Sequence, residues 1–171
     1  MEGLERYVLS DYTHNYLTFS LADELFALPL AQVREIIFYR NVSPIPLMPN
    51  FMRGICNLRG HVMPVIDLAV RLGREPQALH KRSSIVICVL TTGQLLGVLV
   101  DAVCDVLVLL PDTIEAAPLL GTEIRHDFIH GVAAYHDGFV VVLDAERVLH
   151  MSELAELTQQ AHLAFAQQFA N

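Results

Sequence analysis

The sequence predicts a mostly β fold of two small barrels that share a hydrophobic interior, followed by a C-terminal amphipathic helix. Short apolar runs bounded by turn residues recur between residues 16 and 144, a pattern typical of barrels and sandwiches. Several runs are apolar on consecutive positions, so both of their faces require burial. Helical periodicity is almost absent before residue 152. Two barrels that pack against each other satisfy all three observations.

The first five predicted strands precede a polar loop at Gly73–Arg82, which we expect to cross from one barrel to the other. They are Tyr16–Leu21, Leu25–Pro29, Glu35–Arg40, Gly54–Leu58 and His61–Ile66. The last two form a hairpin around Arg59-Gly60, because glycine readily takes the positive φ that a two-residue turn needs. Pro64 cannot donate a ladder hydrogen bond, so its strand is expected to lie at an edge or to carry a bulge.

The other five predicted strands follow the polar loop. They are Ser84–Leu90, Gln94–Val100, Val103–Leu110, Ile129–Tyr135 and Phe139–Leu143. Asp137-Gly138 favours a type I′ turn between the last two. Consecutive apolar residues at Ile85–Leu90, Val106–Leu110 and Val140–Leu143 predict strands that are buried on both faces. We find no convincing internal repeat in the sequence.

The last part of the chain changes to helical spacing. Its apolar residues recur every three or four positions, with Ser152 as a suitable N-cap. They are Leu154, Leu157, Ala161, Phe165 and Phe169. This helix either packs on its own barrel or engages a partner. The expected organisation is an N-terminal extension at residues 1–15, the barrels at 16–149 and the helix at 150–171.

Composition limits the function classes. Nineteen acidic and 11 basic residues give a net charge of −8, which argues against binding nucleic acid or anionic lipid and so against an SH3-like nucleic-acid binder. The chain is 53% hydrophobic, which predicts either an unusually complete core or apolar surface that is kept for protein partners. Its first residues lack the basic start and apolar run of a signal peptide, and we expect a cytoplasmic location without membrane insertion.

Three cysteines lie in apolar runs. Because they are odd in number and surrounded by hydrophobic residues, Cys56, Cys88 and Cys104 are expected to be reduced core thiols.

Three aspartates each follow an apolar strand. Asp67, Asp101 and Asp144 could perform acid–base chemistry. For Asp67 and Asp144, however, the following residues Leu68–Leu72 and Ala145–Leu149 favour N-caps of short helices. No serine or cysteine has a nucleophile context and no glycine-rich phosphate loop occurs, so the sequence predicts no catalytic residue and no cofactor.

The alternative from another class is a metal-dependent hydrolase. His126 and His130 have the spacing that brings two ligands together on a helix, and an aspartate could complete the set. The segment runs toward a strand and lacks the glutamate of a zinc-protease motif, so surface histidines and no metal site are the preferred interpretation.

Glu35 and Arg59 form the remaining constellation. A glutamate within an apolar strand and an arginine on a rigid turn can pair through a forked salt bridge. The pair either orders the hairpin or contributes to a binding surface.

An ordered set of motifs resembles the CheW-like domain of bacterial chemotaxis coupling proteins. The set runs through Tyr16–Leu21, Glu24–Leu30, Val33–Ile36, Ile45–Gly60, Val65–Leu68, Leu95–Val103, His130–Val132 and Val141–Asp144. The resemblance implies two five-stranded, SH3-like barrels and an adaptor without enzyme activity. It also implies two partners, the cytoplasmic signalling tip of chemoreceptors and the regulatory domain of a CheA-type histidine kinase.

Site residues follow from the same resemblance, position by position. It implies a receptor-binding groove that involves Val33, Glu35, Gly54, Arg59, Gly97 and Val103. It implies kinase contacts at barrel-end surfaces, with Leu119 and Leu120 as apolar loop candidates.

Overall fold

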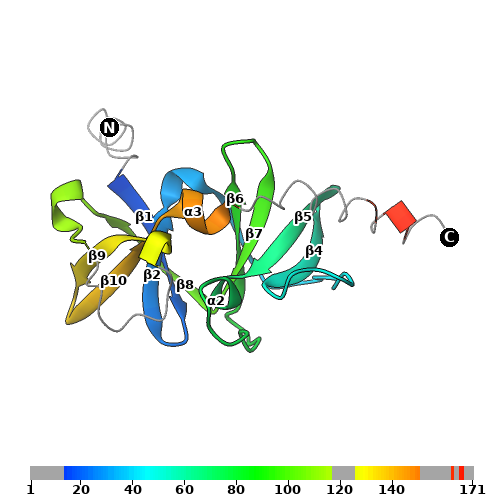
Figure 1. The fold of residues 1–171 in the computed structure, drawn as a ribbon, viewed down its shortest axis with the longest axis horizontal. Helices are drawn as coiled ribbons and strands as arrows, with labels where there is room; N and C mark the ends of the chain where they lie inside the picture. Colours follow the sequence, from blue (N-terminus) through cyan, green and yellow to red (C-terminus); the bar gives the residue numbers. More distant parts are fainter. Residues whose placement is uncertain (1–13, 117–125, 151–162, 164–165, 168–171) are drawn as a thin grey trace, which may run out of the picture.

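The structure is a computed structural model that describes residues 14–116, 126–150, 163 and 166–167. Within these residues, ten strands form two five-stranded sheets, which lie toward opposite ends of the long axis (Figure 1). Sheet A has the strand order β8-β1-β2-β10-β9, and sheet B has the order β3-β6-β7-β5-β4. This mostly β, two-subdomain architecture confirms the predicted fold class.

Sheet A combines strands from both ends of the chain. Its strands are β1 (Asn15–Leu21), β2 (Glu24–Pro29), β8 (Ala102–Val108), β9 (Ile129–Tyr135) and β10 (Gly138–Leu143). All neighbours are antiparallel except β2 and β10, which run parallel through Val141 and Val142. A 3-10 turn at Leu30–Gln32 leads from this sheet into sheet B.

Sheet B is continuous in sequence. Its strands are β3 (Val33–Phe38), β4 (Met52–Leu58), β5 (His61–Asp67), β6 (Ser84–Val89) and β7 (Leu95–Val100). Here β5 and β7 form the parallel pair, and the other neighbours are antiparallel. All ten predicted strands are therefore present, with ends that differ by at most two residues.

Each sheet curls so that its outer strands approach each other, although neither strand ladder closes. In sheet B, the chain after β3 forms an isolated bridge from Ser43 to Ile55 of β4. In sheet A, the chain after β8 forms the corresponding bridge from Glu115 to Val132 of β9. These bridges explain why open five-stranded sheets enclose cores as small barrels do.

Three hydrophobic clusters lie among the described residues. One belongs to sheet B and contains Met63, Ile85, Ile87 and Leu99, whereas another belongs to sheet A and contains Ala133, Val140 and Val142. The largest is shared by both sheets. It includes Leu17, Phe19, Phe26 and Leu28 from sheet A, Ile66, Val86, Cys88, Leu96 and Val98 from sheet B, and the apolar face of a short helix. The shared interior predicted from the two-sided strands is thus present.

Two short helices follow equivalent strands. The helix α2 (Leu68–Arg71) begins after β5, and Asp67 accepts hydrogen bonds from the backbone N–H groups of Ala69 and Val70. The helix α3 (Ala145–Leu149) begins after β10, and Asp144 accepts from the N–H of Arg147. Both N-cap predictions are confirmed. A free carboxylate at a strand end can satisfy the unpaired N–H groups of the next turn.

The polar loop does not cross between the sheets. Gly73–Arg82 connects α2 to β6, and both β5 and β6 belong to sheet B. The chain instead changes sheet after β2 and after β7, where Asp101 accepts a hydrogen bond from the N–H of Ala22. The prediction failed because polarity marks a surface loop but does not say which strands pair on either side of it.

Two predictions about hairpins need correction. The strand β5 lies inside sheet B, but its pairing with β7 begins at Val65, so Pro64 faces β7 without needing an N–H donor there. The turn between β9 and β10 is centred on His136 and Asp137, with His136 at φ +51°, and Gly138 already pairs with Tyr135. The turn therefore starts one residue earlier than the Asp-Gly signal indicated.

One strand is less buried than predicted. Val106, Val108 and Leu110 are 47, 49 and 48% exposed, whereas Leu109 is buried. The apolar run predicted two buried faces, but β8 is an edge strand and one face remains partly open to solvent. Of the predicted terminal helix, residues 163, 166 and 167 are described and are helical, and the rest lies outside the described residues.

Candidate functional site

An apolar groove runs between two edge strands, β3 of sheet B and β8 of sheet A. On the sheet B side, β3 pairs only with β6, and its register skips Arg34. Because of this bulge, Val33, Ile36 and Phe38 stand opposite Cys88, Val86 and Ser84 and share the face that leads to the common core. Ile36 and Phe38 are 41 and 71% exposed, so this wall is both apolar and accessible.

The strand β8 builds the other wall in the same way. Its register with β1 skips Cys104, which places Val103 opposite Phe19 and Val106 opposite Leu17. Since Phe19 and Leu17 belong to the shared core, Val103, Val106 and Val108 continue that apolar face to the edge of sheet A. Both walls therefore extend the shared interior outward.

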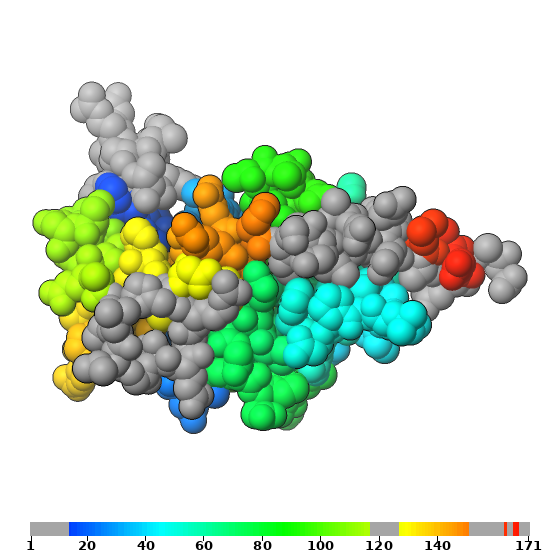
Figure 2. Space-filling view, viewed as in Figure 1, coloured from blue at the N-terminus to red at the C-terminus, as the bar shows by residue number. Residues whose placement is uncertain are grey.

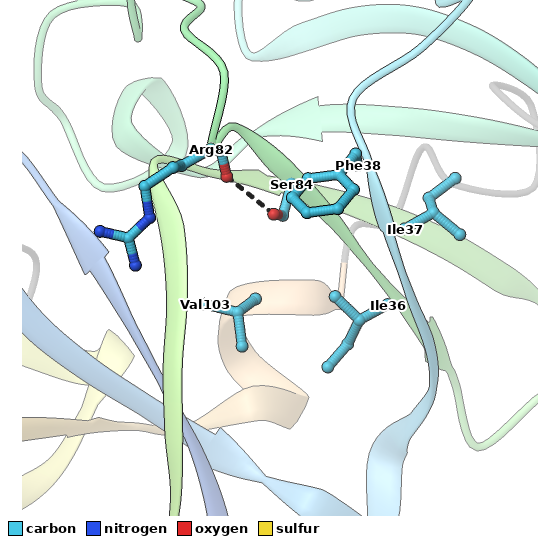
Figure 3. A pocket seen from close by; sticks show the side chains of 6 residues that line it. All are labelled: Ile36, Ile37, Phe38, Arg82, Ser84 and Val103. Atoms are coloured by element: carbon cyan, nitrogen blue, oxygen red, sulfur yellow. Dashed lines mark hydrogen bonds between the residues drawn. The ribbon is translucent and has the colours of Figure 1, made fainter.

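The two walls meet around a cavity of about 250 Å³. It is lined by Ile36, Ile37, Phe38, Arg82, Ser84 and Val103. Figure 3 shows Val103 on one side with Ile36 and Phe38 facing it, while Ile37 points away. The Ser84 hydroxyl donates to the Arg82 carbonyl at 2.8 Å, so this polar group is satisfied within the protein. Apart from the exposed Arg82, the other lining residues are apolar and offer no reactive group, which suits protein binding.

A forked ion pair stands beside the β3 wall. The turn residues Arg59 and Gly60 have φ values of +52° and +84°, as a type I′ hairpin requires, and Asn57 Oδ1 accepts from the Gly60 N–H. From this turn, Arg59 Nη1 and Nη2 donate to Glu35 Oε2 and Oε1 at 2.9 and 2.6 Å. The pair ties the β4–β5 hairpin to β3, which lies at the other edge of sheet B.

Each member of this pair stabilises the charged form of the other. The hydrogen bonds from Arg59 lower the pKa of the Glu35 carboxyl, and nearby Arg40 and Arg34 act in the same direction. Glu35 in turn raises the pKa of Arg59. The carboxylate and guanidinium are therefore both ionised at neutral pH.

The two predicted glycines have packing environments instead of groove positions. A Cβ on Gly54 would lie 2.2 Å from the Ser43 carbonyl oxygen, and φ is +146°. A Cβ on Gly97 would lie 2.9 Å from Ile85 Cγ2 and 3.0 Å from Val65 Cγ2. Both residues are buried in sheet B and permit close approach of the elements behind β3. Leu119 and Leu120 lie outside the described residues.

Sequence reasoning missed most of the exposed groove side chains. Ile36, Phe38, Val106, Val108 and Leu110 alternate along their strands, as residues on one face of a strand must. That alternation was visible in the sequence. What was not visible is that β3 and β8 are the edge strands that face each other.

The histidines considered as metal ligands do not come together in a metal site. His126 begins a 3-10 turn at His126–Phe128, whereas His130 lies in β9, so the two do not share a helix. Among the described residues, no group of three potential metal ligands is close enough to hold an ion. Cys56 and Cys88 are buried as expected, but Cys104 is exposed because it occupies the bulge of an edge strand.

Comparison with known proteins identifies the family. The family model for the CheW-like domain matches residues 15–153. The chain belongs to the CheW-like family. The chemotaxis protein CheW of Klebsiella aerogenes is 33% identical over 141 residues, which are 82% of this chain and 84% of that protein. A probable chemotaxis protein CheW of Rhizobium etli is 31% identical over 137 residues, covering 80% of this chain and 88% of that one.

A solved CheW structure supports the same assignment. The crystal structure of scaffolding protein TtCheW from Thermoanaerobacter tengcongensis has a TM-score of 0.73 and 34% identity, covering 82% of this chain and 90% of that one. CheW-family proteins are non-catalytic scaffold adaptors of chemotaxis signalling, and this chain is one of that class. In the part of the chain that the structure describes, no helix is long and apolar enough to cross a membrane.

Proposed function

We propose that this adaptor couples chemoreceptors, the methyl-accepting chemotaxis proteins, to a CheA-type histidine kinase in chemotaxis or a related chemosensory pathway. The observation that carries the proposal is the apolar groove between β3 and β8 in a chain of the CheW-like family. We expect the protein to act in the cytoplasm, associated with receptor arrays through its partners. It would bias kinase activity by holding receptor and kinase together.

The receptor signalling tip is the proposed occupant of the groove. Its walls present exposed apolar side chains, the kind of surface found at the centre of protein interfaces, and the charged Glu35–Arg59 pair lies on the other face of β3. Val33, Glu35, Arg59 and Val103 would border the bound tip. Gly54 and Gly97 would act indirectly, because they let the chain behind β3 pack closely.

The kinase regulatory domain would bind elsewhere. Leu119 and Leu120 remain our proposed contacts for it, since an adaptor must leave the receptor groove free while it holds the kinase.

A matched pair of substitutions tests the groove. Phe38 and Phe139 are 71 and 70% exposed, but only Phe38 lines the cavity. Phe38→Glu should weaken binding of a receptor signalling tip by about 2 kcal/mol, or roughly thirtyfold, because it places a charge among apolar contacts. Phe139→Glu should leave that affinity within about twofold. Isothermal titration with a tip from the same organism measures both, and equal effects of the two variants would contradict the proposal.

The ion pair has its own test. Arg59→Glu should weaken tip binding while circular dichroism remains that of the native fold, since the side chain is exposed. The double variant Glu35→Arg/Arg59→Glu restores opposite charges across the same two positions. Recovery of binding in the double variant would show that Arg59 braces the groove wall. Continued loss would show that Arg59 contacts the receptor.

A further inference from the structure

The two halves of the molecule repeat one structural unit. In each half an edge strand with a bulge is followed by a hairpin and a capped short helix, namely β3, β4, β5 and α2 in one half and β8, β9, β10 and α3 in the other. The bulge residues are Arg34 and Cys104. The N–H of each cap, Asp67 or Asp144, donates to the carbonyl of a phenylalanine before the hairpin, Phe51 at 2.7 Å or Phe128 at 2.8 Å.

One position breaks this equivalence. Counted from the capping aspartate, Arg71 on α2 corresponds to Val148 on α3, and Val148 is fully buried in the shared core. The guanidinium of Arg71 lies over both equivalent phenylalanines, 5.2 Å from the ring centre of Phe51 and 4.8 Å from that of Phe128. Arg71 therefore sits where the two units meet.

The same side chain holds the end of α3. Arg71 Nε donates to the Val148 carbonyl at 2.9 Å, and Nη2 donates to the carbonyls of His150 and Arg147 at 3.3 and 3.5 Å. These carbonyls belong to the last turn of α3 and the residue after it, where a cation is favoured. One arginine of the sheet B unit thus fixes a helix of the sheet A unit by directed contacts.

The helix that Arg71 holds belongs to the core beneath the groove. Ala145, Val148 and Leu149 of α3 lie in the shared cluster, and Val33 and Val103, one from each groove wall, pack against it. In Figure 2, α3 (orange) lies at the seam between the two halves of the molecule. Figure 3 shows the α3 ribbon behind the space between Val103 and Ile36.

A mainly apolar interface does not fix an angle by itself. Dispersion and burial are non-directional, so the shared core resists separation of the sheets more strongly than it resists rocking. Hydrogen bonds to defined carbonyls, in contrast, hold only in one orientation. Arg74, just after α2, adds an ion pair with Glu24 and lies over the Phe26 ring of sheet A.

We propose that Arg71 is a positioning residue that sets the angle between the two sheets and thereby the width of the β3–β8 groove. It need not contact the groove's occupant. The proposed effect of Arg71 on receptor affinity rests on the function proposed above. Its proposed effect on groove width does not.

Electron paramagnetic resonance can measure the groove width directly. The bulge residues supply one label site on each wall, because Cys104 is exposed and Arg34→Cys adds the partner. Nitroxides at these two sites report the separation of β3 and β8 in the absence of any partner. Cys56 and Cys88 are buried and should remain unlabelled in the folded protein.

We expect Arg71→Met, which keeps length but loses charge and donors, to shift and broaden the nitroxide distance distribution. The control Arg147→Met removes an exposed arginine that forms an ion pair with Asp144, the N-cap of the same helix, and it should keep the wild-type distribution. An unchanged distribution in Arg71→Met would overturn the proposal. If that variant does not fold, Arg71→Gln takes its place with the same two outcomes.

Receptor affinity separates this proposal from the previous one. Arg71→Met should weaken tip binding by about tenfold, within the range of typical coupling between sites. If the wild-type protein does not bind a receptor tip, the proposed function fails while the distance measurement still decides the role of Arg71. A shifted distance distribution with unchanged affinity would show that Arg71 sets the angle between the sheets but that receptor binding does not depend on this angle. That result would overturn the proposed effect of Arg71 on receptor affinity.

Discussion

At the scale of single residues, a charged pair held by backbone geometry ties the β4–β5 hairpin to β3. Arg59 takes a left-handed conformation that non-glycine residues rarely adopt, and this orientation directs its guanidinium to Glu35. Strained residues of this kind persist where the surrounding structure determines them, and they concentrate at functional sites. The residue types alone suggested the Glu35–Arg59 pair. The curl of sheet B explains how β3 and the β4–β5 hairpin, at opposite edges of the sheet, come together.

The ion pair predicts a defined pH dependence. The ordinary pKa of glutamate is 4.5, and that of Glu35 is lowered by Arg59. Its contribution to folding stability is therefore fully present above pH 4.5 and is lost as the pH falls through the lowered pKa. A titration of the Glu35 side-chain carboxyl by nuclear magnetic resonance should give a midpoint below 4.5. Arg59→Met should move that midpoint upward, and an unchanged midpoint would show that the two groups do not interact in solution.

At the scale of elements, the two capping aspartates perform the same task in different surroundings. Asp67 is 2% exposed and accepts bonds from two helix N–H groups, from the N–H and Nε2 of Gln77, and from Arg53. The Asp144 carboxylate is partly exposed, accepts a hydrogen bond from the N–H of Arg147 and lies 3.7 Å from Arg147 Nε. Asp67 thus holds α2 and the following loop together, whereas Asp144 caps only the start of one helix.

Alanine substitution should separate these two roles. Asp67→Ala leaves several buried donors without an acceptor and should lower the free energy of unfolding by about 2 to 4 kcal/mol. Asp144→Ala removes a partly exposed cap and should cost about 0.5 to 2 kcal/mol. Urea denaturation followed by circular dichroism measures both. A larger loss for Asp144→Ala would contradict the contact pattern.

Most elements could be predicted because their signals are local. Strand runs such as Ile85–Leu90, the Arg59-Gly60 turn and the aspartate caps each depend on residues within a few positions. Strand pairing is not local, and that is why the role of Gly73–Arg82 and the edge position of β8 were misjudged. The groove was the hardest feature to predict, because its walls come from strands about 70 residues apart in the sequence. The repeated unit was not predicted for the same reason. The two halves resemble each other in how their strands pair more than in which residues they contain.

At the scale of the whole molecule, the shared core couples the sheets. Leu17, Phe19 and Leu28 from sheet A pack in the same cluster as Val86 and Leu96 from sheet B. Neither sheet can lose its structure without exposing the inner face of the other. We therefore expect a single cooperative unfolding transition instead of two separate ones.

The buried cysteines can test this cooperativity. Cys56 lies in the sheet B cluster and Cys88 in the shared cluster, and burial raises the pKa of both thiols, that of Cys88 to about 12. In native buffer a thiol reagent should modify Cys104 and spare the other two. Along a urea gradient, Cys56 and Cys88 should become reactive at the same midpoint. Distinct midpoints, measured by mass spectrometry of labelled peptides, would show that the sheet B cluster and the shared cluster unfold separately.

The order of strands along the chain also governs how the protein can be assembled during synthesis. Sheet B is complete once β7 has left the ribosome, because all its strands are consecutive. The strands β1 and β2 emerge earlier, yet their neighbours β8 and β10 emerge last. Until then the β1–β2 hairpin, which carries Leu17, Phe19 and Phe26, lacks the two strands that flank it in sheet A, and such exposed apolar strands are prone to aggregate. Folding of sheet B shortens the remaining loop between β2 and β8, which lowers the entropic cost of completing sheet A.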